Sequence, residues 1–202
     1  MGNNDFSWAG ALGAVNLFLF AWSATGATDF LAREQGVLEV TQLLLIAIAF
    51  VAFLVTALRG KGAGRTAAVA LVGLCACFFY RELDLGALGV SGPLATLSKS
   101  SVRDLVLAVG VLILLGYVVL HRSDIPSWWR LATRSDAWPL FCAAILMSIG
   151  ILLNATLKGD LQAQFWEELV EFNGYVLLVL AAARHSRIAA YEDVVERPIV
   201  PN

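Results

Sequence analysis

Long apolar runs constrain this chain more than any other feature. Two of them contain the stretches LLLIAIAFVAFLVTAL at 43–58 and LVLAVGVLILLGYVVL at 105–120. The hydrocarbon core of a bilayer is about 30 Å thick, and a helix of roughly 20 apolar residues crosses it. Backbone groups inside lipid must find their hydrogen bonds within the segment, which favours helices. The runs therefore predict an all-α, polytopic transmembrane helical bundle.

Composition supports a membrane fold along most of the chain. Hydrophobic residues make up 59% and charged residues 15%, and the mean hydropathy is +0.75, whereas soluble domains carry about 25% charged residues. Six helices are predicted, at 8–27, 37–58, 66–82, 104–121, 137–157 and 165–184. We expect one six-helix domain over 1–185, followed by a short cytoplasmic tail at 186–202. Because residues 1–8 contain no lysine or arginine, the first run is expected to be a retained helix rather than a signal peptide.

Basic residues set the expected orientation of the bundle. With six helices, nine of the 14 lysines and arginines fall on the side that holds both termini, and five fall on the other side. Cytoplasmic connections carry the excess of positive charge. We therefore expect both termini in the cytoplasm, in an integral protein of the plasma (inner) membrane that contacts membrane lipid. The net charge of −2 gives no basic patch for nucleic acid.

Two connections have a distinctive composition. Residues 123–135 contain a proline and the pair Trp128–Trp129, which is typical of a helix anchored at the membrane interface. Residues 85–101 form an apolar loop rich in glycine and serine on the outer side. Such a loop is compatible with a re-entrant segment only where protein covers its backbone.

Polar residues at helical spacing mark two predicted helices that both begin on the outer side. They are Gln35, Glu39 and Gln42 in the second helix, and Gln164, Glu168, Glu171 and Tyr175 in the sixth. Residues spaced by three, four and seven positions share one helix face. Because both helices start on the same side, the two polar stripes are expected at the same membrane depth.

Other polar residues are expected at that depth. The third helix ends at Arg81 and Glu82, with Asp84 just beyond, the fifth helix contributes Asn154, and Glu167 lies in the first turn of the sixth. We predict a cation- or proton-binding cluster whose carboxylates come from Glu39, Glu82, Glu168 and Glu171. The supporting residues are Gln35, Gln42, Arg81, Asp84, Asn154, Gln164, Glu167 and Tyr175.

Three explanations for these acids stay open. An acidic side chain at a helix centre costs about 2.5–3.5 kcal/mol on insertion scales, so it needs a proton, a metal ion or a counter-charge. Arg81, with Arg33 and Arg103, could neutralise the acids in a packed ion network. A functional site that binds a cation or proton is the second explanation. The third is a metal-dependent catalytic centre with a divalent ion bound by Glu39, Glu168 and Glu171, since hard cations prefer oxygen ligands.

The remaining residues exclude some cofactors. Three cysteines lie in apolar runs and two histidines lie at helix ends, so neither a cysteine–histidine metal site nor a heme is indicated. No nucleotide-binding motif is present.

Function is predicted only as a class. The first hypothesis is a protein that binds or translocates a cation or protons. The alternatives are a metal-dependent membrane enzyme acting on a lipid-like substrate, for which no catalytic residue is identified, and a non-catalytic subunit that packs against partner membrane subunits or copies of itself.

Overall fold

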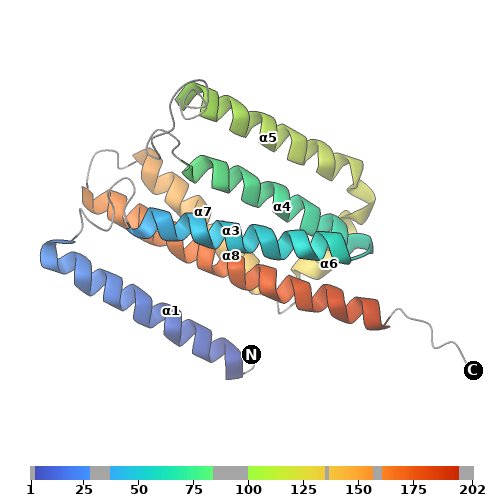
Figure 1. Ribbon diagram of the computed structural model, residues 1–202, viewed down its shortest axis with the longest axis horizontal. Coiled ribbons are helices and arrows are strands. Elements are labelled where there is room, and N and C mark those ends of the chain that lie inside the picture. The colour runs from blue at the N-terminus through green and yellow to red at the C-terminus, as the bar shows by residue number, and fades with distance from the viewer. Residues whose placement is uncertain (1–2, 28–36, 84–99, 135–136, 157–160, 196–202) are drawn as a thin grey trace, which may run out of the picture. The chain divides into compact units, whose positions relative to one another are not determined.

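A computed structural model of the chain describes residues 3–27, 37–83, 100–134, 137–156 and 161–195. Within these ranges the chain is helical apart from short turns, and no strand occurs (Figure 1). The elements are α1 (Asn3–Trp22), the π-helix η1 (Ser23–Ala27), α3 (Val37–Arg59), α4 (Gly62–Glu82), α5 (Ser100–Leu120), the 3-10 helix η3 (Arg122–Asp124), α6 (Ile125–Ala132), α7 (Trp138–Thr156) and α8 (Leu161–Val195).

The all-α fold class is confirmed for the described residues. Each of the six predicted ranges overlaps a helix, with bounds that differ by up to several residues, and α8 continues past 184 into the expected tail. Within the described residues, three helical segments are long and apolar enough to cross a membrane, namely Val37–Arg59, Gly62–Glu82 and Ser101–Leu120. Leu12–Thr25 and Trp138–Leu153 are shorter apolar helices. A bundle of six spanning helices therefore remains a prediction.

Residue contacts divide the chain into two compact units. Unit 1 comprises Met1–Gln42 and Ala143–Tyr175, and unit 2 comprises Leu43–Cys142 and Val176–Asn202. The single domain over 1–185 stays a prediction, as does the re-entrant segment at 85–101, most of which lies outside the described residues.

The turn between α3 and α4 depends on two glycines. The amide of Gly60 donates to the carbonyl of Thr56 at 2.7 Å, and a Cβ at Gly60 would lie only 2.7 Å from the same oxygen. Gly62 has a φ of 52°, in the left-handed region that favours glycine. These two residues let the chain leave α3 and begin α4 within a two-residue connection.

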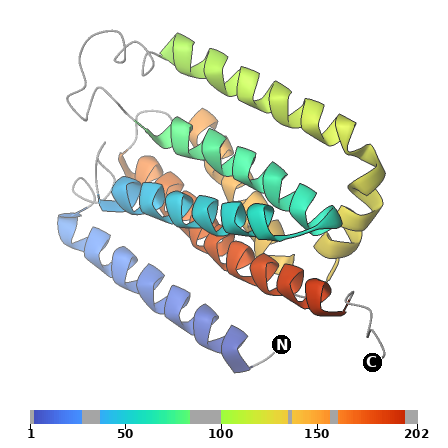
Figure 2. The same cartoon turned by 45° about the vertical axis from the view of Figure 1, so that its right-hand side comes forward.

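Within unit 2, small residues bring α4 and α5 together, and Figures 1 and 2 show the two helices side by side. A Cβ at Gly73 would lie 2.5 Å from Leu114, and a Cβ at Gly110 would lie 2.9 Å from the sulfur of Cys77. Such close approach through small residues is how membrane helices gain packing without a hydrophobic driving force. None of the apolar stretch of α5 is buried.

The predicted interfacial helix is present as α6, with Pro126 in its first turn. Three hydrogen bonds fasten it and α5 to α4 through Thr66. The Thr66 hydroxyl donates to Asp124 Oδ2 at 2.9 Å and accepts from the indole N–H of Trp128 at 2.9 Å. The hydroxyl of Tyr117 on α5 donates to the Thr66 carbonyl at 3.2 Å. The side chain of Thr66 therefore fixes the position of α6 against α4.

Replacing Thr66 with valine tests this attachment. Valine has nearly the same shape but leaves the Trp128 N–H without its acceptor and Asp124 without a donor. We expect the free energy of unfolding to fall by about 1–3 kcal/mol, measured as a lower thermal midpoint in detergent. Thr133→Val is the matched control, because its hydroxyl bonds only to the carbonyls of Trp129 and Arg130. Equal midpoints for the two variants would contradict this role for Thr66.

Candidate functional site

In unit 1, a glutamine of α3 is hydrogen bonded to a glutamate of α8. Gln42 is fully buried, and its Nε2 donates to the backbone carbonyl of Glu168 at 2.9 Å and to Glu168 Oε2 at 2.8 Å. A backbone carbonyl can only accept, so the end of the amide that faces it must be the nitrogen. The orientation of the Gln42 amide is therefore fixed by its surroundings.

That orientation leaves the oxygen of Gln42 as an open acceptor. Gln42 Oε1 is buried and has no hydrogen-bond partner within the described part of the chain. Buried polar atoms are nearly always paired, because an unpaired one costs about 1–3 kcal/mol. A proton donor or a cation is the kind of group that such an oxygen accepts. The acceptor lies beside the carboxylate of Glu168, which favours the same kinds of group.

A second carboxylate lies one turn further along α8. Glu171 is only 2% exposed, and its spacing of three residues from Glu168 puts both on one helix face. A glycine of α7 makes room for it, since a Cβ at Gly150 would lie 2.5 Å from Glu171 Cγ and 2.9 Å from Glu171 Oε1. Tyr175, one turn beyond, is fully buried. Gln42, Glu168 and Glu171 are called the α3–α8 polar cluster below.

A pair of asparagines is a polar contact that sequence reasoning missed. Asn16 on α1 and Asn173 on α8 donate to each other's side-chain oxygens, both at 2.7 Å. Each amide nitrogen also donates to a carbonyl of its own helix, of Leu12 and Leu169 respectively. Asn16 is an amide in an otherwise apolar stretch, a signal that could have predicted a polar partner for it.

The other predicted site residues of unit 1 are less buried than Gln42 and Glu171 or lie outside the described residues. Glu39 lies in the first turn of α3, where the positive end of the helix dipole stabilises an anion. Glu39, Gln164 and Glu167 are all half-buried. Gln35 and Asp84, and the side chain of Asn154, lie outside the described residues.

Arg81 and Glu82 lie together at the end of α4, in unit 2. Arg81 Nε is 3.5 Å from Glu82 Oε1, and the two side chains are 25% and 11% exposed. The predicted ion pairing of Arg81 is thus present with its neighbour in sequence. Convergence of Glu82 with Glu39, Glu168 and Glu171 remains a prediction, because those three belong to unit 1.

No group of three or more histidine, cysteine, aspartate or glutamate side chains among the described residues could hold a metal ion. The metal site suggested over Glu39, Glu168 and Glu171 therefore gains no geometric support. What the α3–α8 polar cluster offers is oxygen acceptors in a setting with little water, suited to a proton or a weakly held cation.

No protein family, curated protein or solved structure matches this chain. Its function must therefore be argued from the site itself.

Replacing Gly150 with alanine tests how closely Glu171 is packed. The added methyl group would occupy the space of the Glu171 side chain, which has little freedom to move because it is buried. We expect Gly150→Ala to lower the free energy of unfolding by about 1–3 kcal/mol, the usual cost of overpacking, measured by thermal unfolding in detergent.

Two controls make the result specific. Gly116→Ala, where a Cβ meets no atom within 4 Å, should be neutral or slightly stabilising, because alanine favours helix over glycine by about 1 kcal/mol. In a Glu171→Ala background the cost of Gly150→Ala should largely disappear. An unchanged cost in that background would show that Glu171 is not the group that the methyl displaces.

Proposed function

We propose that this chain is a multi-pass membrane protein that binds a proton or a cation at the α3–α8 polar cluster, as part of sensing or translocating it. The observation that carries the proposal is the fully buried Gln42, whose Oε1 has no donor among the described residues while its nitrogen is held by Glu168. A proton on a neighbouring carboxylate, or a cation between the oxygens, would satisfy this acceptor.

The surroundings of the cluster favour an exchangeable ligand over a permanent divalent metal. A buried Ca²⁺ ion takes about six to eight oxygen ligands, carboxylates among them, and no group of three or more candidate metal-binding side chains occurs among the described residues. A proton or a monovalent cation needs fewer charges. Ionisable residues within membrane helices are costly to insert, and functional sites are where that cost is most often found.

We further propose six membrane-spanning helices with both termini in the cytoplasm of a plasma-membrane protein. Support comes from the charge distribution of the connections and from contacts within unit 2. His185 Nε2 lies 3.1 Å from the Gly64 carbonyl, and Trp128 bonds to Thr66. The start of α4, the helix α6 and the part of α8 around His185 therefore lie close together. The proposed topology puts all three on the cytoplasmic side, which agrees with these contacts.

A role as a subunit of a larger assembly is the second candidate. Leu112 and Ile113 of α5 are each 66% exposed and Leu120 is 81% exposed, which leaves an apolar surface suited to lipid, a partner subunit or a second copy. The enzyme hypothesis has no comparable observation in its favour.

Cysteine labelling tests the topology. In a cysteine-free background, a cysteine at Lys61, which is exposed, should be protected from an impermeant maleimide in intact cells. A cysteine at Ser98 should react. Lys61 is preferable to Gly62, because any side chain at Gly62 would be strained by its positive φ. Labelling at Lys61 from outside, with Ser98 protected, would reverse the proposed orientation.

The ligand is tested by thermal unfolding of the purified protein in detergent. Wild type and Glu171→Gln are compared from pH 5 to pH 8, and with sodium, potassium, magnesium or calcium against choline at equal ionic strength. A ligand bound only by the folded protein at 100 times its dissociation constant stabilises it by about 2.7 kcal/mol. We expect the wild-type midpoint to rise with falling pH if the ligand is a proton, or with one cation if it is not.

Variants distinguish an effect of the cluster residues from a general effect of removing a negative charge. Glu171→Gln and Gln42→Leu should lose this response, while Asp104→Asn, which removes an exposed acid of α5, should keep it. A wild type indifferent to pH and to every cation, with Glu171→Gln strongly destabilised, would contradict the proposal and favour a structural ion network.

A further inference from the structure

Unit 2 contains a cavity of about 330 Å³ with a strongly asymmetric lining. Of the 13 residues around it, eleven are apolar, the other two are Arg184 and His185, and none is acidic. The volume lies within the range of about 300–1,000 Å³ that is typical of small-molecule sites. An occupant of this cavity must therefore be mostly hydrocarbon, with any charge being negative.

The walls of the cavity are held in place from several helices. Trp128, Leu131 and Ala132 of α6 form one wall, and α6 is fastened to α4 by the hydrogen bonds of Thr66. Phe53 of α3 is fully buried, and its ring centroid lies 6.1 Å from that of His185. A cavity whose walls are fixed in this way keeps its shape without an occupant.

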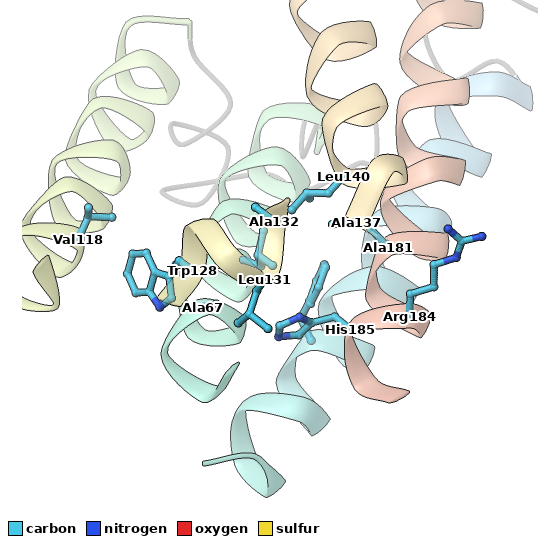
Figure 3. Close-up of a pocket in the computed structure, with 13 residues that line it drawn as sticks. Ala67, Val118, Trp128, Leu131, Ala132, Ala137, Leu140, Ala181, Arg184 and His185 are labelled. Atoms are coloured by element: carbon cyan, nitrogen blue, oxygen red, sulfur yellow. The ribbon is translucent and has the colours of Figure 1, made fainter. Parts of the chain in front are cut away.

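The two basic residues differ in where they point. Figure 3 shows the His185 ring directed toward Leu131, whereas the Arg184 side chain extends from α8 away from the other labelled side chains. The Arg184 guanidinium lies 5.4 Å from the centroid of the Trp138 ring, a cation–π contact that holds it in position. His185 Nε2 faces the Gly64 carbonyl at 3.1 Å, so this nitrogen carries the hydrogen.

The helix α6 indicates the depth of the cavity in the membrane. Trp129 is 65% exposed and Ile125 is 44% exposed, although α6 is too short to cross a bilayer. A short helix with exposed tryptophan and isoleucine is typical of the boundary between headgroups and acyl chains. The cavity, which α6 borders, lies at the level where a phospholipid changes from hydrocarbon to phosphate.

We propose that this cavity binds one acyl chain of an anionic phospholipid, whose phosphate is held at the rim by Arg184. A guanidinium offers several N–H donors in a plane and pairs well with phosphate. The apolar lining accepts the tail, the absence of acids in the lining favours a negative headgroup, and the boundary depth selects a membrane lipid over a soluble anion. This inference rests on the proposed membrane location but not on ion binding at the α3–α8 polar cluster, so failure of either binding experiment leaves the other proposal standing.

Lipid binding is measured by native mass spectrometry of the full chain released from detergent micelles, titrated with phosphatidylglycerol or phosphatidylcholine of identical acyl chains. We expect one lipid to bind with a clear preference for phosphatidylglycerol. Arg184→Gln should reduce that preference by about tenfold, the effect of losing one charge-assisted contact, and should weaken phosphatidylcholine binding less, because the choline cation of that lipid offsets its phosphate charge. Arg59→Gln, which removes an exposed arginine, is the control.

Filling the cavity tests the tail. Ala67→Leu places a larger side chain in the cavity from α4, and Ala76→Leu makes the same change at an exposed position of that helix. Each methylene excluded from an apolar site weakens binding by about fourfold, so Ala67→Leu should reduce the affinity for both lipids by at least about tenfold. Ala76→Leu should behave as wild type.

Photo-crosslinking gives a readout in the unaltered protein, which does not depend on the folding of any variant. Phosphatidylglycerol with a diazirine near the end of one acyl chain should label peptides around Ala67–Leu71 and Leu131–Leu140. Labelling confined to the exposed face of α5 would overturn the proposal. Equal binding of the two lipids by wild type, or an Ala67→Leu variant with wild-type affinity, would overturn it as well.

Discussion

The structure depends on the cost of burying polar groups: a polar group placed among apolar helices must find its partner within the protein. Where burial keeps water out, each unpaired donor or acceptor costs about 1–3 kcal/mol. Many hydroxyls meet this requirement within their own helix, but several polar side chains meet it through contacts between helices that are distant in sequence. Asn16 pairs with Asn173, Gln42 with Glu168, and Thr66 with Asp124 and Trp128. Each of these contacts fixes how two helices are placed along each other: α1 and α8, α3 and α8, and α4 and α6.

Glycine makes these polar contacts compatible with close packing. At Gly150 the absent side chain leaves room for the carboxylate end of Glu171, and at Gly73 it admits Leu114. The first contact places an ionisable group against a helix backbone, while the second packs two apolar helices. In both cases the position of a large side chain is set by the lack of one on its neighbour. A substitution at either glycine therefore acts on the partner helix as much as on its own.

Sequence reasoning predicted the helices well and their contacts only in part. The apolar runs identified each helix because a 20-residue stretch without charges has few other structures, and the proline and tryptophans of 123–135 identified α6. Of the residues grouped by helical spacing, Gln42 and Glu168 are joined by a hydrogen bond between α3 and α8. Periodicity cannot tell which side chains of two helices meet, however, since that depends on helix rotation and on the distance between the axes. Gly150, Asn173 and the Thr66 contacts were missed for this reason, as was the cavity beside His185.

The contrast between two amides separates structural from functional polarity in this protein. In the Asn16–Asn173 pair, both nitrogens use two acceptors and each oxygen receives a hydrogen bond, so the pair is complete without any other group. Gln42 also uses its nitrogen twice, but its oxygen receives no hydrogen bond from the described residues. A closed pair gains nothing from a ligand and has only stability to contribute. The buried Gln42 oxygen beside Glu168 would gain an interaction from a bound proton donor or cation, and binding would then lower the free energy of the folded protein. The two amides are equally polar and differ only in whether every donor and acceptor is paired, which is why the proposed function rests on the cluster and not on the asparagine pair.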